Sequence, residues 1–90
     1  MAMSETQTLL EFPCSFPIKA MGKNSDNFKE LVSGIILRHA ELFEGEEVRA
    51  RTSGSDNFLA ITITIHAVSQ EQLDRIYQEL TASEQVLMAL

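Results

Sequence analysis

FLAITITIHA, residues 58–67, is the stretch of the chain that decides its fold. Its residues alternate with a period of two, the pattern of a β-strand that has one buried face. One face carries Leu59, Ile61, Ile63, Ile65 and Ala67, and the other carries Phe58, Ala60, Thr62, Thr64 and His66. A slip of one residue would bury two threonines and a histidine, so the pattern predicts that the isoleucines face the core.

A helix and a last strand are predicted after this stretch. Ser69 is followed three residues later by Gln72, which is the spacing of a capping box at a helix start. A buried stripe then recurs at helical spacing through Leu73, Ile76, Tyr77 and Leu80. Residues 86–90 are all apolar and predict a strand at a sheet edge, which favours self-association. The alternative is that this strand is buried between the second helix and the N-terminal arm.

A hairpin is predicted immediately before residues 58–67. Serine, glycine, aspartate and asparagine dominate residues 52–57 and favour a turn, and residues 48–52 predict a short strand. Since side chains alternate along a strand, Val48 and Ala50 are expected to face the core, and Arg49 and Arg51 to face away from it.

The first strand is predicted over residues 12–20, where apolar residues again alternate. Pro13 and Pro17 cannot donate a backbone hydrogen bond, so they belong at the strand start or beside a free edge. The best-paired part is therefore expected at residues 18–21.

A long helix is predicted between this strand and the hairpin. Asn24 or Ser25 is expected to cap it, and its apolar residues recur three and four apart to about Leu42. Gly34 costs about 1 kcal/mol relative to alanine inside a helix, so it either lies on the solvent side or admits another backbone. Residues 1–11 are expected to form a flexible arm.

The order strand, helix, strand, strand, helix, strand defines the fold class. With short connections and right-handed crossovers, it predicts an α+β, ferredoxin-like βαββαβ sandwich that occupies residues 12–90 as a single domain. Four antiparallel strands in the order 4-1-3-2 are expected to carry both helices on one face.

Composition and charge restrict the function of such a domain. The chain has 90 residues, of which 44% are hydrophobic, and its 7 Lys and Arg against 13 Asp and Glu give a net charge of −6. This charge repels nucleic acid phosphates and anionic membranes, so neither is an expected partner. The single cysteine, Cys14, and a start without a basic and then apolar stretch predict a cytoplasmic protein.

Six short stretches stand out by their order and spacing. They are Phe12-Pro13, residues 18–22 (IKAMG), Arg38-His39-Ala40, the Ser-Gly turn before Phe58, residues 61–65 (ITITI) and residues 86–90. Together they resemble the YbeD-like family of small bacterial proteins, over about residues 10–90. The resemblance implies a ferredoxin-like fold similar to the ACT regulatory domains that bind amino acids, and it brings no catalytic residues. The sequence departs from the family pattern at two positions. Gly54 lies earlier relative to the aromatic residue that follows the turn, and that aromatic residue is Phe58 instead of a tyrosine.

The open face of the predicted sheet is the first candidate site. Six side chains are expected to share it: Lys19, Arg49, Arg51, Thr62, Thr64 and His66. Guanidinium and ammonium groups on one face suit a carboxylate, a phosphate or the acidic surface of a protein partner. The competing interpretation is that Arg49 and Arg51 only protect an edge strand against aggregation.

The junction of the first strand and the first helix is the second candidate site, formed by Gly22, Lys23, Asn24 and Ser25. Backbone N–H groups and the positive end of a helix can accept an anion there. In the ACT domains that the chain resembles, this junction helps to form the effector pocket. That likeness implies small-molecule binding at a dimer interface, and an ordinary turn is the alternative.

No reaction centre is predicted. His39 and His66 have no metal-binding spacing, and no nucleophile comes with an evident base and orienting group. Phe58 is the only clear aromatic residue on the open face, which argues against base stacking with RNA. We therefore expect no metal, no cofactor and no catalysis, but a regulatory or adaptor module that binds a protein partner, its own copy or a small anion. The alternative is an ACT-like effector binder.

Overall fold

The computed structural model describes residues 11–90, which form one sheet and two helices. The elements in chain order are β1 (Cys14–Lys23), α2 (Phe28–His39), β2 (Arg49–Ser53), β3 (Phe58–Ala67), α3 (Gln70–Ala82) and β4 (Val86–Ala89). The predicted arm, residues 1–11, lies outside the described residues except for Glu11. Neither helix within residues 11–90 is long and apolar enough to cross a membrane.

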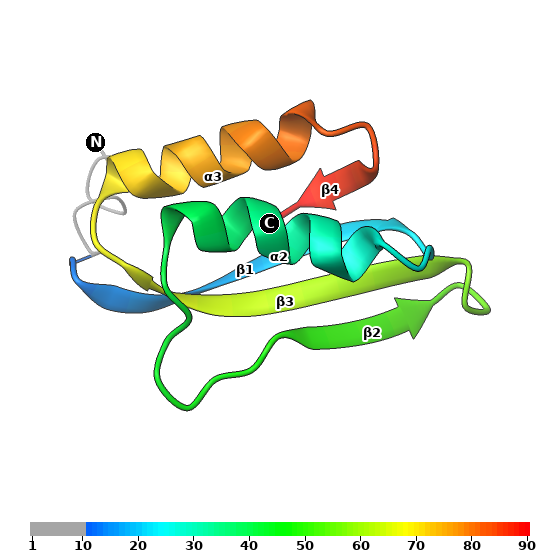
Figure 1. The fold of residues 1–90 in the computed structure, drawn as a ribbon, viewed down its shortest axis with the longest axis horizontal. Coiled ribbons are helices and arrows are strands. Elements are labelled where there is room, and N and C mark those ends of the chain that lie inside the picture. Colours follow the sequence, from blue (N-terminus) through cyan, green and yellow to red (C-terminus); the bar gives the residue numbers. More distant parts are fainter. Residues whose placement is uncertain (1–10) are drawn as a thin grey trace, which may run out of the picture.

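The sheet has the order β2-β3-β1-β4, and all neighbouring strands run antiparallel. Read from the other edge this is 4-1-3-2, so the predicted ferredoxin-like topology is confirmed. Both helices lie on the same face of the sheet (Figure 1). The other face is not covered by any element of residues 11–90.

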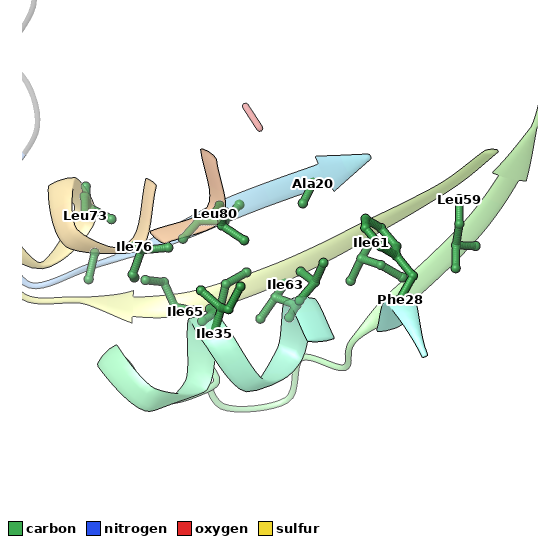
Figure 2. Packing of buried hydrophobic residues seen from close by; sticks show 14 residues of the cluster. Ala20, Phe28, Ile35, Leu59, Ile61, Ile63, Ile65, Leu73, Ile76 and Leu80 are labelled. Atoms are coloured by element: carbon green, nitrogen blue, oxygen red, sulfur yellow. The ribbon is translucent and has the colours of Figure 1, made fainter. Parts of the chain in front are cut away.

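The isoleucines of β3 form the centre of the core. Ile61, Ile63 and Ile65 have no exposed surface, and they pack against the apolar stripes of the two helices (Figure 2). Burial of one such side chain stabilises the fold by about 1.5–3 kcal/mol. Thr62 and Thr64, which alternate with them, are only partly buried, so the predicted facing of β3 is correct.

β1 pairs with β3 along all ten of its residues, whereas the sequence predicted good pairing only for residues 18–21. The prediction was too short because the sequence does not show towards which neighbouring strand a proline lacks its N–H group. Lys19 exchanges both of its backbone hydrogen bonds with Leu90, on the β4 side of the strand. Pro17, two residues earlier, therefore lacks its donor on that same side, beyond the end of β4, and does not interrupt the pairing with β3.

α2 ends at His39, three residues before the end predicted at Leu42. Residues 41–43 are extended instead and run beside β3, with hydrogen bonds of 2.9 Å to the backbones of Thr64 and His66. Leu42 still packs against the core from this segment, which is why its spacing resembled a further helical turn.

The structure also decides three smaller predictions. The start of α3 predicted at Ser69 is confirmed, since Ser69 Oγ accepts a hydrogen bond from the Gln72 N–H at 3.1 Å. The reciprocal bond of a capping box is shifted by one residue, because the Gln72 side chain accepts from the Val68 N–H and not from the Ser69 N–H. A Cβ added to Gly34 would meet no heavy atom within 4 Å, so this glycine lies on the solvent side. Ala50 is opposite the core residue Ile61 but stays exposed, because neither helix extends over the edge strand β2.

Candidate functional site

The open face of the sheet concentrates positive charge. None of the four strands contains Asp or Glu, whereas they hold four of the seven Lys and Arg residues of the chain. These four are Lys19 and Lys23 in β1, and Arg49 and Arg51 in β2. Because alternate residues share a face and the isoleucines of β3 take the helical side, all four cations project from the open face.

Lys19 and Arg49 lie on opposite sides of Thr62, since both are register partners of that residue. Arg51 is the partner of Ala60, which is only 6% exposed although it lies on the open face. The cations of β1 and β2 thus stand on two sides of a low floor on β3. We call this hollow the cationic trough; it has a volume of about 430 Å³ and is lined by Lys19, Arg49, Ala50, Arg51, Ala60 and Thr62.

Thr64 and His66 belong to the same face but lie farther along β3, outside the cationic trough. Their register partners on β1 are Pro17 and Ser15, so that strand places no cation beside them. The His66 ring packs against Phe43, with 5.1 Å between the ring centroids. The structure therefore brings together four of the six side chains predicted for this surface.

Arg49 forms one ion pair within the part of the chain that the structure describes, and the sequence did not indicate it. Its Nη2 atom lies 3.9 Å from Glu46 Oε1, in the loop before β2. Lys19 and Arg51 form no ion pair with any of residues 11–90. The trough therefore keeps an excess of positive charge that Glu46 only partly offsets.

The predicted junction site, residues 22–25, is largely committed to the fold. The backbone N–H and the side-chain amide of Asn24 both donate, at 2.9 Å, to carbonyl groups of the β2–β3 turn. The helix cap predicted at Asn24 or Ser25 is wrong, because Asn27 holds that position and makes no side-chain capping hydrogen bond.

Gly22 is needed for packing. A Cβ at this position would lie 2.2 Å from the backbone oxygen of Gln85 and 2.5 Å from the Phe28 ring. Gly22 is buried in β1, so the strand continues through the first residue of the predicted loop.

A second hollow nevertheless exists beside the junction. We call it the junction hollow; it measures about 430 Å³ and is lined by Lys23, Ser25, Glu84, Gln85 and Leu87. The last three residues come from the connection between α3 and β4 and from β4 itself. Sequence reasoning missed them because only the folded sheet brings β4 beside the end of β1.

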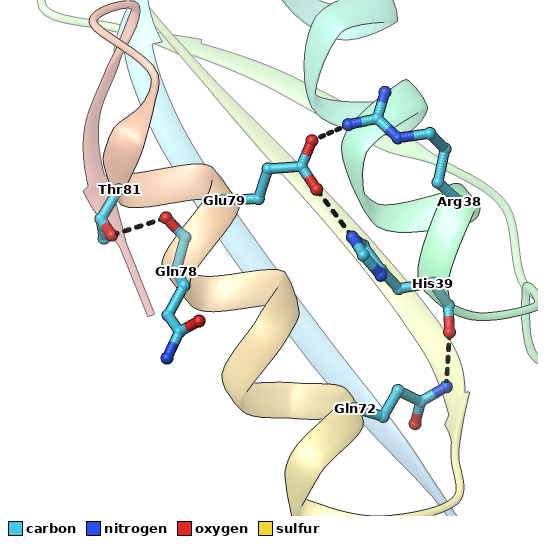
Figure 3. Close-up of polar contacts among 6 residues, drawn as sticks. All are labelled: Arg38, His39, Gln72, Gln78, Glu79 and Thr81. Atoms are coloured by element: carbon cyan, nitrogen blue, oxygen red, sulfur yellow. Dashed lines mark hydrogen bonds and ion pairs between the residues drawn. The ribbon is translucent and has the colours of Figure 1, made fainter.

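A polar cluster joins the end of α2 to α3 (Figure 3). Glu79 Oε1 lies 2.7 Å from His39 Nε2, and the other carboxylate oxygen pairs with Arg38. His39 continues the apolar spacing of α2, but it is only partly buried and turns its ring towards Glu79. No sequence spacing relates these residues, which meet only because the two helices pack together.

The described residues offer binding chemistry through cations and hydroxyl groups. Among residues 11–90, no three His, Cys, Asp or Glu side chains come together as a metal site requires. Cys14 is a free, partly buried thiol in β1.

Comparison with known proteins identifies the family. Residues 7–90 match the family described as "Protein of unknown function (DUF493)". The chain belongs to the DUF493 family. A UPF0250 protein of Chromobacterium violaceum is 41% identical to this DUF493 chain over 86 residues, 96% of this chain and 97% of that protein. One from Paraburkholderia phytofirmans is 38% identical over 87 residues, 97% of this chain and 98% of that protein, and the resemblance to YbeD-like proteins is thereby confirmed.

Two solved structures share the fold of this DUF493 chain. Protein HP0495 from H. pylori has a TM-score of 0.71 at 12% identity, covering 90% of this chain and 85% of its own. The ACT domain of the GTP pyrophosphokinase from Chlorobium tepidum has a TM-score of 0.55 at 15% identity, covering 84% of each chain. At these identities the likeness shows the ferredoxin-like, ACT-like fold and no more.

Proposed function

We propose that this DUF493 chain is a noncatalytic, cytoplasmic regulatory or adaptor module that binds a partner protein through the open face of its sheet. The cationic trough carries the proposal, because it gathers positive charge on one face of a chain whose net charge is −6. Such a surface steers an acidic partner towards one face while the rest of the chain repels it.

The position of Lys19 distinguishes partner binding from simple protection of a sheet edge. Charged side chains on an edge strand discourage aggregation, which accounts for Arg49 and Arg51 on β2. Lys19 lies on β1, which has a neighbouring strand on each side and needs no such protection. A cation at this central position favours recognition.

The test is a comparison of two double variants as bait for affinity purification and mass spectrometry. K19Q/R51Q removes one lysine and one arginine from the trough, and K29Q/R75Q removes the same two from exposed positions on the helices. We expect capture of the partner to fall about tenfold for the first variant only, as loss of charge-assisted hydrogen bonds predicts. Equal capture by both variants would exclude the open face as the surface that binds the partner.

A second candidate function is that of an ACT-like effector binder, and the junction hollow favours it. Lys23 and Glu84 both line this hollow, so it offers charges of opposite sign to the carboxylate and the ammonium of an amino acid. A ligand that binds only the folded state raises the melting temperature. Thermal-shift screening with amino acids and small carboxylates is expected to give a hit that K23Q loses, and a flat screen would exclude this function.

Self-association through β4 is the arrangement that effector binding at a dimer interface requires. Leu87, Met88 and Leu90 are 57%, 52% and 65% exposed along this sheet edge, where another strand can pair. Sedimentation at high micromolar concentration is expected to show a dimer, and a monomer at that concentration would reject this arrangement.

A further inference from the structure

The two sides of the cationic trough are separated by two strand spacings. β3 lies between β1 and β2, so the backbones that carry Lys19 and the two arginines are about 10 Å apart. The floor between them is low, since it consists of the methyl group of Ala60 and the side chain of Thr62. A group resting on this floor meets cations from both sides at once.

The donors of the trough suit a small anion with several oxygen atoms. A guanidinium group donates two parallel hydrogen bonds to a carboxylate or phosphate, an ammonium group offers three donors, and the Thr62 hydroxyl offers one more. The volume of about 430 Å³ lies within the roughly 300–1,000 Å³ of small-molecule sites. None of the side chains from residues 11–90 that line the trough is acidic.

We propose that the cationic trough binds a small polyanion, either a phosphate ester or a di- or tricarboxylate. Its oxygens lie between Lys19 and the arginines, and its carbon skeleton lies over Ala60. The inference rests on the proposed function, because the same side chains receive the acidic partner. It adds a mode of regulation, since a bound polyanion occupies the cations and displaces that partner.

Titration of the isotope-labelled chain with pyrophosphate, and separately with citrate, tests the site by two-dimensional amide NMR. We expect saturable shifts at Lys19, Ala60 and Thr62 with at least one of the anions. Binding of pyrophosphate would identify the ligand as a phosphate compound, and binding of citrate would identify it as a carboxylate. Saturable shifts with neither anion would overturn the proposal.

Matched variants distinguish binding at the cationic trough from a general effect of net charge. K19Q and R51Q are expected to weaken binding about tenfold each, whereas K29Q and R75Q, which remove the same charges from the helices, leave it nearly unchanged. Equal weakening in all four variants would also overturn the proposal.

Partner capture distinguishes this inference from the proposed function. If K19Q/R51Q loses its partner while the wild-type chain binds neither anion, the docking surface stands and the small ligand is rejected. If an anion binds at the trough while K19Q/R51Q captures its partner undiminished, the ligand site stands, and the docking role and the displacement are rejected.

Discussion

Gln72 Nε2 donates a hydrogen bond to the backbone oxygen of His39 at 2.9 Å. The same side chain accepts one from the Val68 N–H at 2.8 Å through its Oε1 atom, and the Gln72 backbone N–H is bound by Ser69 Oγ. One residue therefore closes the start of α3 and the end of α2 together. The glutamine that the sequence predicted at the start of α3 is thus also a tertiary contact between the helices.

Replacing Gln72 with alanine is expected to lower the free energy of unfolding by about 1–2 kcal/mol, because two backbone groups lose their partner. Urea denaturation measures the loss. Q78A is the matched control, since Gln78 lies exposed on the same helix and its side chain makes no hydrogen bond with residues 11–90. A loss no greater in Q72A than in Q78A would contradict the joint role of Gln72.

Gly22→Ala is expected to destabilise the protein by about 1–3 kcal/mol, the usual cost of overpacking. The added methyl group would lie 2.2 Å from the Gln85 carbonyl oxygen, and backbone cannot move aside as a flexible side chain can. Thermal and urea denaturation both report the change. A variant as stable as the wild type would show that β1 and β4 are not held together this closely.

Gly34→Ala is expected to have the opposite sign. This residue lies inside α2 with open space around it, so a methyl group meets no atom and removes backbone freedom from the unfolded chain. The free energy of unfolding should rise by about 0.5–1 kcal/mol. A destabilised G34A would mean that the helix surface is covered at this point.

Ionisation of Tyr77 is expected to lower the stability of the protein at alkaline pH. Burial raises the pKa of its phenol above the 10.0 of a free tyrosine, and the hydroxyl donates a hydrogen bond of 2.8 Å to the Leu90 backbone oxygen. Because the raised pKa belongs to the folded state, this stabilisation is fully present below about pH 10 and is lost as the pH rises through the folded value.

The pKa of Tyr77 can be measured directly, because Tyr77 is the only tyrosine and the chain has no tryptophan. Tyrosinate absorbance should titrate at higher pH in the native protein than in urea, and Y77F should lose less stability above pH 10 than the wild type. Identical titration midpoints in the native and unfolded chains would refute the effect of burial.

The sequence predicted those features that depend on one element at a time. The alternation in β3 gave its facing and hence the face shared by Lys19, Arg49 and Thr62, and the Ser69–Gln72 spacing gave the start of α3. Contacts between different helices and strands do not produce a periodic pattern in the sequence. The end of α2 was misplaced for this reason, since a residue of an extended segment can occupy a core position at helical spacing.

The candidate sites show the same division. The cations of the trough could be assigned because strand periodicity fixes the face of each residue. The partner of Arg49 could not, since Glu46 belongs to a loop without periodicity. The lining of the junction hollow by Glu84 and Leu87 likewise depends on how β4 lies against β1.

Glu46 is the acidic side chain that competes with an anion for Arg49, so E46Q should bind pyrophosphate more tightly than the wild type. An exposed ion pair contributes up to about 1 kcal/mol, which corresponds to a gain in affinity of about two- to fivefold. E44Q is the matched control, because Glu44 is exposed in the same loop and its loss changes the net charge equally. The difference between the two variants should shrink at high salt, which screens exposed charges. Equal gains in E44Q and E46Q at low salt would show that only net charge had changed and that Glu46 does not compete for Arg49.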